Sequence, residues 1–106
     1  MTVSEAIEKL RTSLEGKKEQ VAGLSGSFQF HLTGEGGGSF YAEAKDGEVE
    51  ILEGTHPSPK VTVSMAVEDM GALLEGKLNP MAAFMQGKLK VQGDMGLALK
   101  LQNLFS

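Results

Sequence analysis

The sequence predicts an α+β fold, in which a five-stranded, mainly antiparallel sheet carries helices on one face and leaves a charged, open face on the other. Apolar residues recur at helical spacing near the N-terminus and in the last third of the chain, whereas the centre alternates apolar and polar residues. Strands joined by short turns pair antiparallel, so the helices have one sheet face to cover. Because 106 residues is the length of one domain, we expect residues 1–106 to form a single domain.

The N-terminal segment predicts an amphipathic helix. Thr2 and Glu5 have the spacing of a capping box, and apolar residues then recur at intervals of four, three and four positions. These apolar positions are Val3, Ile7, Leu10 and Leu14. The helix should end near Gly16, with a weak continuation as far as Gly23.

Four strands are predicted between residues 26 and 65. Apolar residues alternate with polar ones in residues 26–33, 40–45, 48–51 and 60–65. The dipeptide Asp46-Gly47 is a strong hairpin signal between the second and third of these strands. The glycine cluster at residues 34–38 leads into a strand rather than a helix, so we interpret it as a hairpin turn and not as a phosphate-binding loop.

The last third predicts three helices and a fifth strand. Ser64 is a candidate N-cap for a helix that ends at Gly76, and Asn79, followed by proline, is the N-cap of a second helix. Residues 88–92 alternate as a half-buried strand, and Asp94 can cap the last helix. On that helix the polar residues form a narrow stripe, so one flat partner cannot cover its apolar surface. Another helix, a partner chain or a ligand should cover the rest.

Composition and charge exclude several classes of protein. The chain has no cysteine, which excludes a disulfide scaffold and a thiolate zinc site, and its net charge of −4 with no basic stripe argues against nucleic-acid binding. No apolar run approaches the roughly 20 residues that span a bilayer, and the acidic N-terminus does not resemble a signal peptide. We therefore expect a soluble, cytoplasmic protein.

The charge is unevenly placed along the chain. Residues 1–76 carry 6 basic and 13 acidic side chains, a net charge of −7, whereas residues 77–106 carry four lysines against Asp94, a net charge of +3. The lysines are Lys77, Lys88, Lys90 and Lys100. They could form an ordinary solvated face, or they could meet a phosphate-bearing ligand or an anionic membrane.

No catalytic or metal-binding constellation is evident. His31 and His56 have no second histidine or carboxylate at metal-ligand spacing, and Ser64 lacks the glycines of a nucleophile elbow. The acidic residues of the 43–50 hairpin alternate with apolar ones and should face solvent. We expect no enzymatic activity, no metal and no cofactor.

The segment GKLNPMAAFMQGKLKVQGDMGLALKLQNLF, from Gly76 to Phe105, resembles the C-terminal half of the sterol carrier protein 2 domain family. The shared patterns are G-K-x-N-P, A-F-x-Q-G-K-L-K and G-D/N-M-G-L-A-x-K-L-Q-N-L. The resemblance implies a non-enzymatic lipid carrier, monomeric, with an apolar tunnel between sheet and helices for sterols, fatty acids, fatty acyl-CoA or isoprenoid-like lipids. The chain ends without the tripeptide that directs proteins to peroxisomes, so a cytoplasmic location and acyl or isoprenoid ligands are expected.

The predicted ligand-binding residues combine the resemblance with the apolar pattern. Six methionines in a chain without tryptophan can line a cavity that adapts to several shapes, or can simply fill the core. The predicted wall is Phe28, Phe30, Phe40, Met70, Leu74, Met81, Phe84, Met85, Met95, Leu99, Leu101 and Phe105. Gln86 and Gln102 match family positions and could meet a polar head group, or could bond backbone only.

Two other functions remain open on the sequence. The chain could be an accessory domain that docks through its apolar last helix onto a lipid-metabolising enzyme or onto a second copy of itself. It could also be an enzyme acting on acyl-CoA, such as a thioesterase or isomerase, although it has no cysteine and no recognisable catalytic pair.

Overall fold

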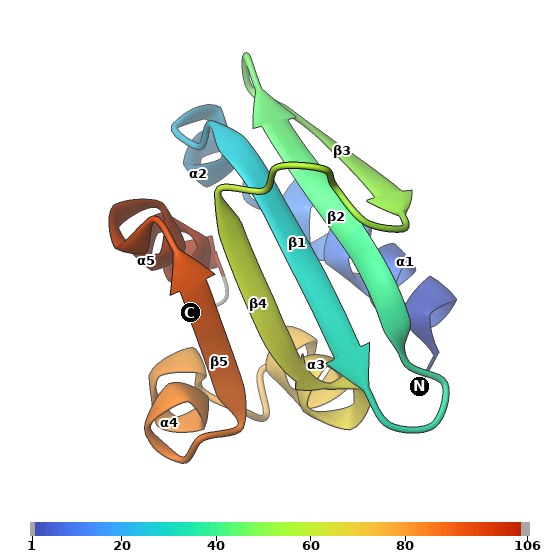
Figure 1. The fold of residues 1–106 in the computed structure, drawn as a ribbon. Helices are drawn as coiled ribbons and strands as arrows, with labels where there is room; N and C mark the ends of the chain where they lie inside the picture. The colour runs from blue at the N-terminus through green and yellow to red at the C-terminus, as the bar shows by residue number, and fades with distance from the viewer. Residues whose placement is uncertain (1, 105–106) are drawn as a thin grey trace.

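A computed structural model describes residues 2–104 and contains a mixed five-stranded sheet with helices on one face (Figure 1). The strand order is β3-β2-β1-β4-β5, and three of the four pairings are antiparallel. The strands are β1 (Gly26–Thr33), β2 (Gly38–Lys45), β3 (Glu48–Glu53), β4 (Val61–Ala66) and β5 (Leu89–Gly93). The α+β class with a mainly antiparallel sheet is therefore confirmed, and the parallel pair is β1 with β4.

The helices lie behind the sheet in the view of Figure 1. They are α1 (Val3–Glu15), α2 (Lys18–Ala22), α3 (Val67–Leu74), α4 (Pro80–Met85) and α5 (Met95–Leu104). Thr2 caps α1 as predicted, because its hydroxyl oxygen accepts a hydrogen bond from the Glu5 amide at 3.3 Å. Among the described residues, no helix is both long enough and apolar enough to cross a bilayer.

The core lies between the sheet and α1, α2 and α3. Phe30 of β1 and Phe40 of β2 are direct cross-strand partners, and their rings stack with centroids 4.7 Å apart. Ala6 and Leu10 of α1 are buried in the same cluster. Since aromatic side chains contribute the largest buried areas, this stacked pair is a main source of packing energy.

Three predicted local signals hold and one does not. The Asp46-Gly47 turn joins β2 to β3 with positive φ at both residues (54° and 81°), which is the backbone of a tight hairpin. The Asn79 carboxamide oxygen accepts from the amides of residues 81 and 82 at the start of α4, and the Asp94 carboxylate accepts from the Leu97 amide in α5. Ser64, predicted as an N-cap, instead lies inside β4, and α3 begins three residues later without a side-chain cap.

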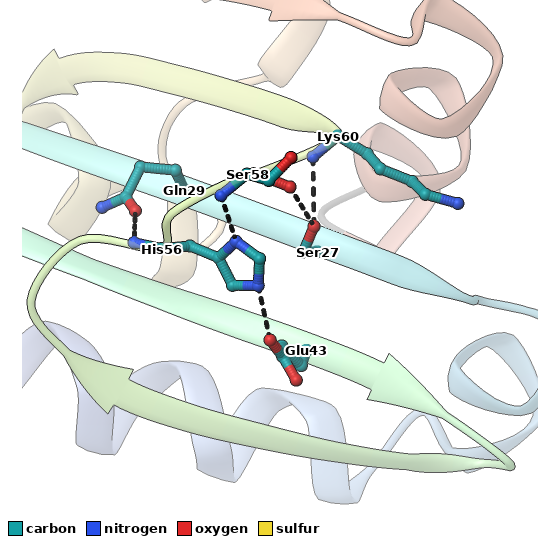
Figure 2. A network of polar contacts seen from close by, with 6 residues as sticks. All are labelled: Ser27, Gln29, Glu43, His56, Ser58 and Lys60. Atoms are coloured by element: carbon teal, nitrogen blue, oxygen red, sulfur yellow. Dashed lines mark hydrogen bonds and ion pairs between the residues drawn. The ribbon is translucent and has the colours of Figure 1, made fainter.

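The outer face of the sheet is not entirely open, contrary to the prediction. The connection from β3 to β4 must pass from one edge of the sheet to the far side of β1, and it crosses the outer face (Figure 1). Beneath it the Gln29 side chain is 1 % exposed. Its amide nitrogen donates to the carbonyls of Phe40 and Gly54, and its oxygen accepts from the His56 amide at 2.7 Å (Figure 2). A buried polar group that is fully bonded fixes the loop in place.

Candidate functional site

An apolar cavity of about 280 Å³ lies between the sheet and the C-terminal helices. Eight of its wall residues belong to the predicted set. They are Phe30, Met70, Met81, Phe84, Met95, Leu99, Leu101 and Gln102. The other seven are Val63, Met65, Leu73, Pro80, Leu89, Val91 and Ala98.

The strands β4 and β5 form the floor of the cavity. In their antiparallel register Val63 lies opposite Val91, and Met65 lies opposite Leu89. Side chains two positions apart share one face of a strand, so all four point towards the helices. The sequence predicted these alternations but could not show which strand pair would border a cavity.

One face of α5 forms a side wall. Met95, Ala98, Leu99 and Gln102 line the cavity and occupy positions i, i+3, i+4 and i+7, which share one helix face. Leu97, outside this face, is buried in the core. The helix start is fixed at Gly93, where φ is 111° and an added Cβ would lie 2.2 Å from the Lys60 carbonyl oxygen. Only glycine permits this close approach, after which α5 begins directly.

Three predicted wall residues from the sheet and α3 lie elsewhere. Phe28 is 1 % exposed and Phe40 0 % exposed, and neither lines the cavity. Both share the helix-facing side of the sheet with Phe30, but they pack in the core. Leu74 is partly buried against that core. Burial on the correct face was predictable, whereas the position of the cavity along that face was not.

Two predicted residues at the end of α4 are exposed and do not line the cavity, and one falls outside the described part. The side chain of Met85 is 79 % exposed, and it is not part of the wall. Gln86 is the exposed C-cap residue of α4. Phe105 lies outside the described residues. The apolar run of α4 gave no sign of this division, because no charge marks its outer side.

The mouth of the cavity is apolar and partly open to solvent. Met81 and Phe84 of α4 and Met95 and Leu99 of α5 line the wall, yet they are 47–58 % exposed. An exposed apolar cluster of this kind marks a binding surface. The expectation that the last helix carries more apolar surface than the described part of the fold covers is confirmed.

The described wall of the cavity is almost entirely apolar. Gln102 is its one residue with a polar side chain, and no charged residue lines it among the described residues.

On the opposite face of the sheet His56 lies 2.6 Å from the Glu43 carboxylate, a contact that the sequence did not predict. Because the His56 Nδ1 accepts from the Ser58 amide, its Nε2 carries the proton donated to Glu43 (Figure 2). No group of three or more metal-ligating side chains occurs in the described part of the chain.

A concave, apolar cavity with one polar residue, set between a sheet and short helices, defines a binding domain for apolar small molecules. The sequence model of the SCP-2 sterol transfer family matches residues 5–106, and the chain belongs to this family. Membership, predicted from the C-terminal motifs, places the chain among lipid-binding and lipid-transfer domains.

Several known proteins are similar to the chain. Sterol carrier protein 2 of Bos taurus is 40 % identical over 101 residues, 92 % of this chain and 19 % of that protein. Hydroxysteroid dehydrogenase-like protein 2 of Xenopus tropicalis is 42 % identical over 89 residues, 82 % of this chain and 21 % of that protein. The chain thus spans about a fifth of the curated relatives that it matches. The solution structure of palmitated SCP2L2 from Aedes aegypti has a TM-score of 0.72 at 30 % identity, covering 99 % of this chain and 95 % of that one.

Proposed function

We propose that this chain is a non-enzymatic carrier that binds one fatty acyl chain, as a fatty acid or fatty acyl-CoA, or an isoprenoid lipid of similar width. The observation that carries the proposal is the apolar cavity of about 280 Å³ with a half-exposed apolar mouth. Ligand cavities usually measure about 300–1,000 Å³, so this one lies just below the usual range. That size favours a single flexible chain over the broad, rigid ring system of a sterol.

The energetics suit a carrier that must also release its ligand. Burial of about 0.8 kcal/mol per methylene gives on the order of 10 kcal/mol for a long chain. Lost translational and rotational freedom offsets several kcal/mol of this, which leaves roughly micromolar affinity. The palmitated state of the Aedes aegypti relative supports a saturated chain as ligand.

The polar end of the ligand should lie near Gln102. This residue is half-buried on α5 and is the polar member of the described wall. A carboxylate or thioester beside it would stay close to solvent while the hydrocarbon fills the apolar remainder. A cavity wall without described charges offers the chain no strong anchor, which supports release as well as uptake.

A substitution that fills the cavity tests the proposal. Ala98 lies in the wall, and Ala98→Trp should displace at least two methylenes of a bound chain, a loss of at least about tenfold in affinity for a fluorescent fatty acid. Phe84→Trp at the mouth should have a smaller effect in the same direction. Ala22→Trp adds the same side chain at an exposed position of α2 and should leave affinity unchanged. Equal affinities in folded Ala98→Trp, Phe84→Trp and Ala22→Trp proteins would contradict this use of the cavity.

An accessory role is the second candidate. Met95 and Leu99 of α5 are 51 % and 58 % exposed, and the curated relatives are about five times longer than the chain. A domain that docks onto a lipid-metabolising enzyme, or onto a second copy, could cover these residues with protein. Light scattering on a size-exclusion column separates the two, since the proposed cytoplasmic carrier is monomeric and binds lipid alone.

A further inference from the structure

The cavity is open towards one edge of the sheet and closed towards its centre. Its wall takes Leu89 and Val91 from the edge strand β5, Val63 and Met65 from β4, and Phe30 from β1. Burial increases in this order, from partly buried side chains on β5 to 4 % exposure on β4 and 1 % exposure for Phe30. Among the described residues, none from β2 lines the cavity. Phe30 is therefore the innermost sheet residue of the wall.

The helices around the cavity follow the same direction. The side chains of α4 and α5 at the mouth are 47–58 % exposed. In contrast, Met70 and Leu73 of α3 lie in the same wall and are 0 % and 3 % exposed. The helix α3 packs behind β4 and β1 (Figure 1). The inner end of the cavity is therefore formed by Phe30 together with these two side chains of α3.

The surrounding core holds Phe30 in place. Its ring stacks on that of Phe40 in β2, with 4.7 Å between the ring centroids and 10° between the ring planes. Phe40 is 0 % exposed and belongs to the same buried cluster as Ala6 and Leu10 of α1. A close-packed interior yields only at the cost of strain, so the Phe30 ring cannot retreat to admit a longer ligand. Phe30 is thus a fixed end of the cavity on the side of the sheet.

We propose that Phe30, supported by Phe40, selects ligands by chain length, because the methyl end of a bound saturated acyl chain stops against its ring. This inference rests on the proposed carrier function. Each further methylene that the cavity buries should raise affinity about fourfold. Beyond the length that reaches Phe30, additional methylenes stay outside the mouth in water, so affinity should level off. The carrier therefore gains nothing from acyl chains longer than this limit.

Competition between a fluorescent fatty acid and saturated fatty acids of increasing length tests this limit. In the unmodified chain, affinity should rise with length and then level off. Phe30→Ala opens space that is continuous with the cavity, so the rise should continue for at least two more methylenes, about 15-fold in affinity for chains beyond the original limit. Phe30→Leu removes less volume and should shift the limit in the same direction. Phe28→Ala is the matched control, since that ring is also 1 % exposed on the same face of β1 but lies outside the wall, so the limit should not move.

Photolabelling of the unmodified chain tests the same orientation without a substitution. A fatty acid with a diazirine at its methyl end should label β1 or α3, and one with a diazirine beside the carboxylate should label α4 or α5. The reverse pattern would overturn the inference and leave the carrier, as would the same length limit in the unmodified chain and in folded Phe30→Ala and Phe30→Leu proteins. Equal shifts for Phe28→Ala and Phe30→Ala would assign the limit to general loosening of the core and overturn the role of Phe30. A complete lack of fatty-acid binding by the unmodified chain would instead contradict the carrier function itself.

Discussion

The two halves of the helix-covered sheet face differ in how closely their side chains are packed. Under α1 the central side chains are closely packed: Ala6, Leu10 and Phe40 are 0 %, 3 % and 0 % exposed. Under α4 and α5 the same face borders a cavity, and wall residues such as Phe84 and Leu99 are more than half exposed. The first half supplies the packing that stabilises the fold, and the second half leaves apolar surface that a ligand can cover.

Helix length and pattern account for the contrast. The helix α1 has 13 residues and an outward side rich in charge, so it covers its part of the sheet and ends in water. The helix α4 has six residues, too few to span the strands beside it. Because α5 is apolar on more than one side, packing Leu97 into the core still leaves Leu99 and Met95 uncovered. The exposure of these apolar side chains thus follows from the length of α4 and the apolar pattern of α5.

The largest expected effect comes from truncating one phenylalanine in each half. Phe40→Ala removes a fully buried ring stacked on Phe30, so it should lower the free energy of unfolding by about 3–5 kcal/mol. Phe84→Ala removes a ring that is 52 % exposed and should cost about 1 kcal/mol or less. Urea denaturation measures both. Similar losses would mean that the two halves are equally packed and that the contrast is wrong.

A ligand should narrow the difference in rigidity between the halves. Palmitate at about 100 times its dissociation constant should stabilise the protein by about 2.7 kcal/mol, provided that it binds the folded state alone. In hydrogen exchange without ligand, we expect the amides of α4, β5 and α5 to exchange faster than those of β1 and β2. Palmitate should slow exchange mainly in α4, β5 and α5. Protection confined to α1 and β3 would place the ligand elsewhere.

Sequence reasoning predicted what depends on local chemistry. The alternation of residues 26–33 and 40–45 identified β1 and β2 and the side of each strand that is buried. Asn79 and Asp94 were identified as caps because a short polar side chain before an apolar run can accept the free amides of a helix start. The family motif, confined to the C-terminal third, indicated the class of protein.

What escaped prediction depends on contacts between distant segments. Gln29 lies on the polar side of its strand in sequence, yet the crossing loop buries it, and that loop follows from the strand order rather than from any nearby residue. Phe28 and Phe30 lie two positions apart on the same face of β1. Their different positions along the strand place Phe30, and not Phe28, in the cavity wall. The outward direction of Met85 was equally hidden, since an apolar residue normally points inwards.

The smallest expected effect concerns a surface link between the two halves. The Glu75 carboxylate, at the end of α3, lies 2.6 Å from the Lys9 ammonium of α1 and 3.3 Å from that of Lys77 before α4. Hydrogen bonds from Lys9 and Lys77, with their positive charge, lower the pKa of Glu75 below its ordinary value of 4.5. The pairs are well exposed, so their contribution to stability should be small and reduced by salt.

The lowered pKa fixes the direction of the pH dependence. The contribution of Glu75 is fully present above pH 4.5, the value in the unfolded chain, and is lost as pH falls through the lower folded value. Glu75→Gln should therefore be slightly less stable than the unmodified chain at neutral pH, and the gap should narrow as the pH falls below 4.5 and close once the pH lies below the lowered pKa of Glu75 in the folded protein. Urea midpoints across this range give the measurement, with Glu68→Gln, an exposed acid of α3, as control. A gap that persists in acid would assign the effect to packing rather than to the ion pairs, and the two halves would then be joined by contact instead of charge.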